Sequence, residues 1–358
     1  MTKRRFKSAR GLVPHLAFLC IAWFLSVLAT LSASSIFQEP QHKSYAVDIF
    51  SAADQTWLLI CSDQKCSVLR RGIGASNWVE LAALPLGAER IYFSDAVHGW
   101  CLVTGATSGR LTTDLWGTGN GGKDWELLSH PSEFQHFGTG VGDMAFLDSK
   151  NGWVLGRGAI GRGAVLETND AGHNLYEVTS PPELQRAVNR IFASSGGDVW
   201  FVGNRMIVHR SQTGQSWETR EVPEALSDYP LATRFESIKI LEGGLGWVVG
   251  GESDPVILSS KDAGRSWEIK LRVAGTGTFN DIAFGSKTFG CAVGSEALVF
   301  CTNDGGNIWR RVFLDQANSS LKRVVMLPSG EGWIVSVSGE LYEMKGFSGS
   351  WNRVVPFQ

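Results

Sequence analysis

Tryptophan recurs at two regular places along this chain, and that recurrence is the strongest constraint on its fold. The first set ends a short apolar run at steps of 42 to 53 residues, with Cys291 filling one slot: Trp57, Trp100, Trp153, Trp200, Trp247 and Trp333. The second set follows 17 to 25 residues later, with Leu175 or Tyr176 substituting once: Trp78, Trp125, Trp217, Trp267, Trp309 and Trp351. Each set has seven slots, so the chain contains seven copies of one unit.

Each copy is predicted to form four short strands joined by tight turns. In the fifth copy the apolar runs are 238–241, 247–250, 256–259 and 267–270. Four such strands form one antiparallel blade, and a repeat in the forties is typical of a propeller. We therefore predict an all-β fold, a seven-bladed β-propeller of four-stranded antiparallel blades over residues 46–358. Neighbouring blades stack face to face, so the flat indole rings are expected to fill the core between them.

Residues 1–35 are predicted to be a targeting segment. Residues 1–33 contain five basic residues and no acidic residue, and an apolar run at 16–31 precedes small residues. This order is typical of a cleaved secretory signal, whereas residues 12–33 are long enough for a retained membrane anchor. Under both alternatives the rest of the chain is exported to a periplasmic or other extracytoplasmic location, either released or anchored to the inner membrane. Residues 36–45 are expected to be a linker.

The charge balance disfavours a nucleic-acid partner. The whole chain has a formal net charge of -2, and the residues after 33 contain 28 basic and 35 acidic residues. Proteins that bind nucleic acids usually present a strongly basic face, and a domain with a net negative charge is not expected to have one. The seven histidines form no HExxH motif, and no CxxC pair is present. We therefore expect no metal and no other cofactor.

The cysteines after the targeting segment suggest disulfides. Cys61 and Cys66 bracket a tight turn, and an exported chain meets oxidising conditions, so a bridge between these two is a candidate. Cys291 and Cys301 flank another hairpin turn and form a second candidate pair. Cys101 is expected to be a small buried apolar side chain.

The turn before the fourth strand carries the most specific motif. It reads Ser/Thr-x-Asp-x-Gly-x-x-Trp at 260–267 and 302–309, with close variants at 118–125 and 168–175. An Asp or Asn side chain accepts hydrogen bonds from turn amides, and Gly supplies a positive φ. Because the motif recurs from blade to blade, we assign its acidic or amide residues a structural role in fastening the turn: Asn120, Asp170, Asp262 and Asp304.

This motif resembles the Asp-box, or BNR repeat, of sialidases, sortilin-type receptors and other propellers. The added Gly-Trp-x-Val-Gly strand, as at 246–250, is more similar to the photosystem II stability/assembly factor family, and the resemblance covers about residues 46–358. It implies an exported propeller that binds a protein partner and assists the assembly or stability of a membrane or envelope complex.

Two alternatives remain, a sialidase-like or other carbohydrate-active enzyme and an adhesion or ligand-binding receptor. Sialidases share an Arg-Ile-Pro motif, but here Arg190 and Ile191 are followed by Phe192. Glycosidases also need two facing carboxylates, and the acidic residues here follow the repeat. A non-enzymatic protein is therefore preferred.

Binding is expected where the copies differ. The residue just before each first strand varies: Arg90, Asp143, Arg190, Ser237, Asp281 and Arg323. If the first strands line the channel, the three arginines meet at one mouth, where they could grip a carboxylate or an acidic peptide. The alternative is that they are solvated and paired with Asp143 and Asp281. Trp116 belongs to neither tryptophan set, so an exposed role in recognition is a further hypothesis.

Overall fold

The computed structural model describes residues 44–355 with internal gaps. The gaps are 108–109, 135–136, 138–141, 158–162, 180, 186–187, 213–215, 227–232, 276, 316 and 348. The predicted targeting segment at 1–35 and most of the linker at 36–45 lie outside the described residues.

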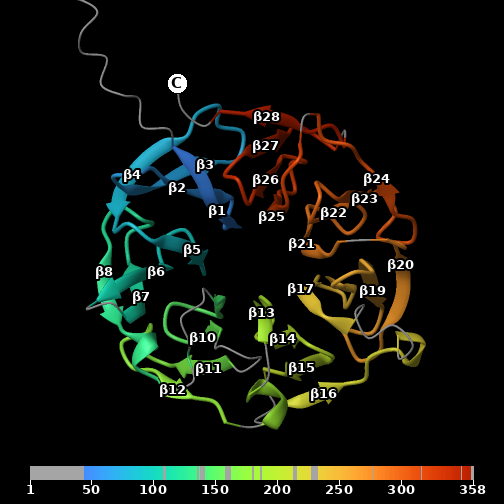
Figure 1. Ribbon diagram of the computed structural model, residues 1–358, viewed down its shortest axis with the longest axis horizontal. Helices are drawn as coiled ribbons and strands as arrows, with labels where there is room; N and C mark the ends of the chain where they lie inside the picture. The colour runs from blue at the N-terminus through green and yellow to red at the C-terminus, as the bar shows by residue number, and fades with distance from the viewer. Residues whose placement is uncertain are drawn as a thin grey trace, which may run out of the picture. The chain divides into compact units, whose positions relative to one another are not determined.

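The described strands form seven four-stranded antiparallel sheets arranged as a ring, which confirms the predicted propeller (Figure 1). Each blade uses four consecutive strands, and the first strand is innermost. Blades 1 to 4 contain β1 (Tyr45–Ala52), β2 (Gln55–Cys61), β3 (Cys66–Gly72), β4 (Val79–Leu84), β5 (Ala88–Phe93), β6 (Gly99–Thr107), β7 (Arg110–Thr118), β8 (Glu126–Ser129), β9 (Met144–Phe146), β10 (Gly152–Arg157), β11 (Gly163–Thr168), β12 (Tyr176–Glu177), β13 (Val188–Ala193), β14 (Val199–Gly203), β15 (Met206–Arg210) and β16 (Glu218–Arg220). Blades 5 to 7 contain β17 (Phe235–Ile240), β18 (Gly246–Gly250), β19 (Val256–Ser260), β20 (Glu268–Arg272), β21 (Phe279–Phe284), β22 (Gly290–Gly294), β23 (Val299–Thr302), β24 (Arg310–Arg311), β25 (Leu321–Met326), β26 (Gly332–Ser336), β27 (Leu341–Met344) and β28 (Asn352–Val354).

Short 3-10 helices lie in three of the connections between blades. They are η1 (Pro131–Glu133), η3 (Pro182–Gln185) and η4 (Glu224–Leu226). In the part of the chain that the structure describes, no helix is both long enough and apolar enough to cross a bilayer.

The first tryptophan set fills the core between neighbouring blades, as predicted. Five of the six indoles are no more than 1% exposed, and Trp100 is 2% exposed. Three of these indoles, including Trp247, stack on a phenylalanine of the next blade, and the ring centroids of Trp247 and Phe284 are 3.7 Å apart. Trp309 of the second set meets Phe284 edge-on at 6.0 Å, so this phenylalanine is held between two indoles. Such aromatic contacts add to the free energy gained by burying the rings.

The Asp-box turns use one hydrogen-bond pattern. The Ser260 hydroxyl accepts a 2.8 Å hydrogen bond from the Gly264 amide, and Asp262 Oδ1 accepts one of 2.9 Å from the Ser266 amide. The equivalent amide bonds to the side chains of Asn120, Asp170 and Asp304 are 3.0, 2.9 and 3.0 Å long. Hydrogen bonds from Ser266 and Ser260 lower the pKa of Asp262 to about 2. These carboxylates and the amide thus fasten their own turns.

The ring closes by packing of blade faces, because every sheet is built from consecutive strands. Strand β1 lies beside β25 (Figure 1), and the Ala46 amide donates a 2.9 Å hydrogen bond to the Gly339 carbonyl. Arg71 of blade 1 also bonds to Glu343 of blade 7 at 2.6 Å. The seam between the first and last blades is therefore held by the same kind of core as the others, with ion pairs added.

Two disulfides cross-link neighbouring strands. One joins Cys61 to Cys66 across β2 and β3, and the other joins Cys291 to Cys301 across β22 and β23. Cys101 is unpaired and fully buried, and this burial raises the pKa of its thiol.

Candidate binding site in the central channel

Seven residues occupy equivalent positions around the channel, six on the inner strands and one directly before β9. These residues are Asp48, Arg90, Asp143, Arg190, Ser237, Asp281 and Arg323, which we call the channel ring. In six blades the register of the inner strand is irregular just before the ring residue, as between Ala88 and Arg90. A β-bulge inserts one residue and re-aims the following side chain. In these six blades the bulge explains why the ring residue departs from the regular alternation of the strand, and five of the seven ring residues line the central cavity.

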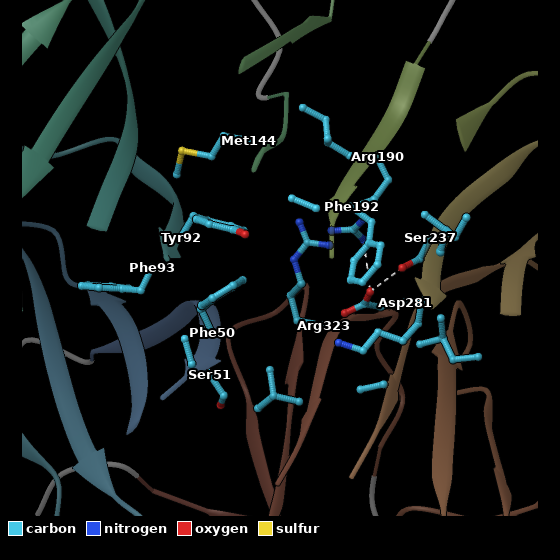
Figure 2. A pocket seen from close by; sticks show the side chains of 18 of the residues that line it. Phe50, Ser51, Tyr92, Phe93, Met144, Arg190, Phe192, Ser237, Asp281 and Arg323 are labelled. Atoms are coloured by element: carbon cyan, nitrogen blue, oxygen red, sulfur yellow. Dashed lines mark hydrogen bonds and ion pairs between the residues drawn. The ribbon is translucent and has the colours of Figure 1, made fainter. Parts of the chain in front are cut away.

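The arginines and aspartates of the channel ring pair with one another. Arg90 Nε donates to Asp143 Oδ1 at 2.6 Å, and its Nη1 reaches Asp48 Oδ1 at 3.3 Å. Arg323 Nε donates to the same Asp48 oxygen at 3.1 Å. Arg190 Nη2 lies 3.3 Å from Asp281 Oδ1, which also accepts a 2.9 Å hydrogen bond from Ser237 (Figure 2). Charges held away from water need such partners.

This network changes the expectation for Arg90, Arg190 and Arg323. The structure brings all three to one cavity, but they are only 6 to 9% exposed. They are therefore not solvated, and each is held by an aspartate. Arg90 in particular lies between two carboxylates, so it is not available to a ligand in the way the sequence suggested.

The three aspartates also join neighbouring blades through the backbone. Asp48 Oδ2 accepts a 2.9 Å hydrogen bond from the Ile91 amide. The Asp143 and Asp281 side chains accept equivalent bonds of 3.0 Å from the Ile191 and Val324 amides. Burial raises the pKa of Asp143, and it raises that of Asp281 to about 7. Each carboxylate therefore has a structural role between blades.

A cavity of about 340 Å³ extends from the channel ring toward the carboxyl ends of the inner strands. Aromatic side chains from three blades form much of its wall: Phe50, Tyr92 and Phe192 (Figure 2). The Tyr92 hydroxyl donates to the Phe146 carbonyl at 2.9 Å. Tyr92 therefore contributes mainly its ring to the cavity, which combines an ionic base with apolar walls.

Comparison with known proteins supports the repeat assignment. Residues 268–356 match the family described as photosynthesis system II assembly factor YCF48. A structure of YCF48 bound to a D1 peptide is 16% identical, with a TM-score of 0.59 over 86% of this chain and 94% of that chain. YCF48 from Cyanidioschyzon merolae is 15% identical, with a TM-score of 0.58 over 85% and 97%. This chain is a BNR-repeat propeller similar to the photosystem II assembly factors.

The same propeller architecture also occurs in enzymes. A catalytically inactive virginiamycin B lyase from Staphylococcus aureus is 12% identical to this BNR-repeat propeller, with a TM-score of 0.63 over 86% of this chain and 97% of that chain. No curated protein matches the sequence significantly. At these identities the structural likeness shows the fold alone, and function depends on the site.

Sequence reasoning missed two charged residues of the channel in this BNR-repeat propeller, Asp48 of the channel ring and Lys239. Lys239 follows the ring residue Ser237 by two positions on β17, and its Nζ lies 5.1 Å from the ring centroid of Phe192. Burial lowers the pKa of Lys239. The equivalent positions in the other blades are Phe50, Tyr92, Ala145, Phe192, Ala283 and Val325. A lysine at a position that is otherwise aromatic or aliphatic is the signal that could have identified it.

Trp116 is not the exposed side chain that a recognition role requires. It lies on β7 and packs, half-buried, against the apolar cluster between blades 1 and 2 that contains Trp57 and Cys101. Its Nε1 is buried without a hydrogen-bond partner. The expectation of exposure was wrong because the alternating strand directs this ring into the blade interface. Within the described ranges, no three His, Cys, Asp or Glu side chains form a metal-binding group.

Proposed function

We propose that this BNR-repeat propeller is an exported, non-enzymatic scaffold that binds a protein partner and assists the assembly or stability of a membrane or envelope complex. The observation that carries the proposal is the match of residues 268–356 to the photosystem II assembly factor family. The central cavity supports it, because rims and channels of propellers are rigid places for recognition. A propeller of the same architecture holds a D1 peptide.

Export is supported by the cysteines and by the amino-terminal composition. Disulfides persist in oxidising compartments and are rare in the cytosol, and this domain contains two. Residues 1–35 carry the basic, apolar and small-residue order of a signal or an anchor. A periplasmic or other extracytoplasmic location is therefore part of the proposal.

The lack of catalysis is supported by the state of the channel carboxylates. A glycosidase needs one carboxyl group to give a proton and another to act as base or nucleophile. Here Asp48, Asp143 and Asp281 each accept a backbone amide and an arginine or hydroxyl group. These contacts occupy the oxygens that such chemistry would use. A screen on sialosides and glucans tests this part, and turnover on any of them would contradict it.

Site-specific photocrosslinking in the native host tests partner binding. A photoreactive phenylalanine replaces Ser51 or Ser194, which line the cavity, or Tyr176 on the outer strand β12, which is 59% exposed. We expect a discrete crosslink to a membrane or envelope protein from the cavity positions and none from position 176. Equal crosslinking from all three positions, or none from the cavity, would contradict the proposal. An extracellular partner would instead support the receptor alternative.

A further inference from the structure

We propose that the central cavity binds one carboxylate group carried by an aromatic or other apolar group, with Lys239 and Arg323 as its cationic contacts. The inference rests on the proposed function, because it names the chemistry by which the channel recognises what it binds. This site differs from the one suggested by the sequence, in which three equivalent arginines bind the acidic group, because the structure gives the three arginines different surroundings.

The balance of charges in the channel leaves one cation over. Three arginines and three aspartates of the channel ring pair with one another. Lys239 adds a fourth positive group, and it has no ion pair with any residue that the structure describes. Desolvation penalises such an ammonium group, and the one nearby opposing charge acting on it is that of Asp281. Above about pH 7, where Asp281 is ionised, a single bound negative charge would therefore balance the channel, whereas a polyanion would exceed it.

Arg323 supplies hydrogen-bond donors that its neighbours do not use. Its Nε is bonded to Asp48, but among the described residues none accepts from its two Nη groups. Arg90, by contrast, contacts Asp48 and Asp143 together. Figure 2 shows Arg323 directed into the cavity near Phe192 and Arg190. A guanidinium fork binds carboxylates well, because both Nη groups can donate to the two oxygens.

The cavity walls define the rest of the ligand. Phe50, Tyr92 and Phe192 present rings, and Ala283 and Val325 present small apolar groups. A volume of about 340 Å³ lies at the lower end of the range of small-molecule sites. It suits one aromatic or aliphatic group with its carboxylate and is too small for a folded element. Lys239 lies against Phe192, so the cationic and apolar parts of the site are contiguous.

Two sources offer this chemistry. One is the carboxy-terminal residue of a partner chain, and the other is a free aryl-alkyl carboxylate. Both present an apolar group next to one negative charge, and the following experiment separates them.

Calorimetric titration of the purified full-length protein tests the proposal. The probes are 3-phenylpropionate, its amide, and an acetylated octapeptide that ends in phenylalanine with either a free or an amidated carboxyl group. We expect at least one acid to bind about tenfold or more tightly than its matched amide, because charge-assisted hydrogen bonds are lost in the amide. Preference for the peptide acid identifies a chain terminus as the source, and preference for 3-phenylpropionate identifies a free carboxylate.

Three variants locate the site. Lys239→Met should remove most of the preference for acid over amide, and Arg323→Lys should weaken acid binding while keeping the charge beside Asp48. Lys261→Met is the matched control, because the Lys261 side chain is 69% exposed in an Asp-box turn outside the cavity. Its affinities should equal those of the native protein. Thermal unfolding of each variant shows that the domain is folded.

Equal binding of acids and amides, no binding of any probe, or an unchanged preference in Lys239→Met would overturn the proposal. Those results leave the photocrosslinks at positions 51 and 194 unaffected, so failure of the carboxylate site is distinguishable from failure of partner binding.

Discussion

The indole Nε1 of Trp100 donates a 2.7 Å hydrogen bond to the main-chain carbonyl of Ala171. Trp100 lies on β6 of blade 2, and Ala171 lies in the Asp-box turn of blade 3. The same indole stacks on Phe146 of blade 3, with ring centroids 3.5 Å apart. One side chain therefore holds both the inner strand and the Asp-box turn of the next blade, which links the two recurring motifs of the sequence.

Replacing Trp100 by Phe should separate the hydrogen bond from the packing. We expect Trp100→Phe to cost about 0.5–1.5 kcal/mol more unfolding free energy than Trp153→Phe, because the hydrogen bond to the partly buried Ala171 carbonyl is lost. Trp153 is the matched control, since it is equally buried and its Nε1 has no hydrogen-bond partner among the described residues. Urea unfolding of the two variants measures the difference. Equal losses would show that the Ala171 bond adds little to stability.

Two features of the Asp-box turn favour glycine, a positive φ and a close contact with the neighbouring blade. Gly264 has φ +74°, and an added Cβ would overlap the ring of Trp200 in the preceding blade. Gly346 has a similar φ of +67° with nothing near its Cβ position. Gly346→Ala should therefore cost about 1–2 kcal/mol from the backbone alone. Gly264→Ala should cost about 1–3 kcal/mol more, as expected for overpacking. Similar melting temperatures for the two variants would contradict the close contact.

The fold could be predicted from the sequence because its signal is repeated. Seven copies place Trp57 and its equivalents at one structural position. The repeat can still be recognised where one copy lacks the tryptophan, as at Cys291. The structural role of the Asp-box residues was equally predictable from the sequence, because their hydrogen bonds are local to one turn.

The channel was only partly predictable because its contacts join residues far apart in the chain. Asp48, which bonds to both Arg90 and Arg323, was missed because the first copy departs most from the repeat. Lys239 was missed because it follows the ring residue by two positions. For Trp116 the sequence suggested an exposed side chain, whereas the structure shows it partly buried, because a residue outside the repeat pattern can still pack against the core.

Removing Arg90 should strongly destabilise the domain. Its guanidinium lies between Asp48 and Asp143, and all three side chains are buried. Arg90→Met leaves both carboxylates short of a partner, so we expect a loss of about 3–5 kcal/mol in unfolding free energy. Lys65→Met is the matched control, because Lys65 pairs with Glu80 at 2.8 Å on the surface. Exposed pairs contribute about 1 kcal/mol or less. If both variants unfold at the same urea concentration, the channel network does not stabilise the ring.

Asp281 should make stability depend on pH near neutrality. Burial raises its pKa in the folded domain to about 7, from 3.8 for an unperturbed carboxyl group. The folded state therefore holds a proton that the unfolded state has released, and the contribution of Asp281 is greatest below about pH 4 and is lost as the pH rises through about 7. Comparison with Asp281→Asn isolates this effect, because asparagine keeps the shape and cannot titrate.

The unfolding free energy of the native domain, minus that of Asp281→Asn, should fall between pH 5 and pH 8. Asp262→Asn is the control with the opposite sign: hydrogen bonds lower the pKa of Asp262 to about 2, so its contribution is lost only as the pH falls from about 4 toward 2. Its difference from the native domain should stay level from pH 5 to pH 8. A level difference for Asp281→Asn over the same range would mean that Asp281 is already ionised in the folded channel. In that case Arg190 and Ser237 compensate its charge more fully than their distances of 3.3 and 2.9 Å indicate.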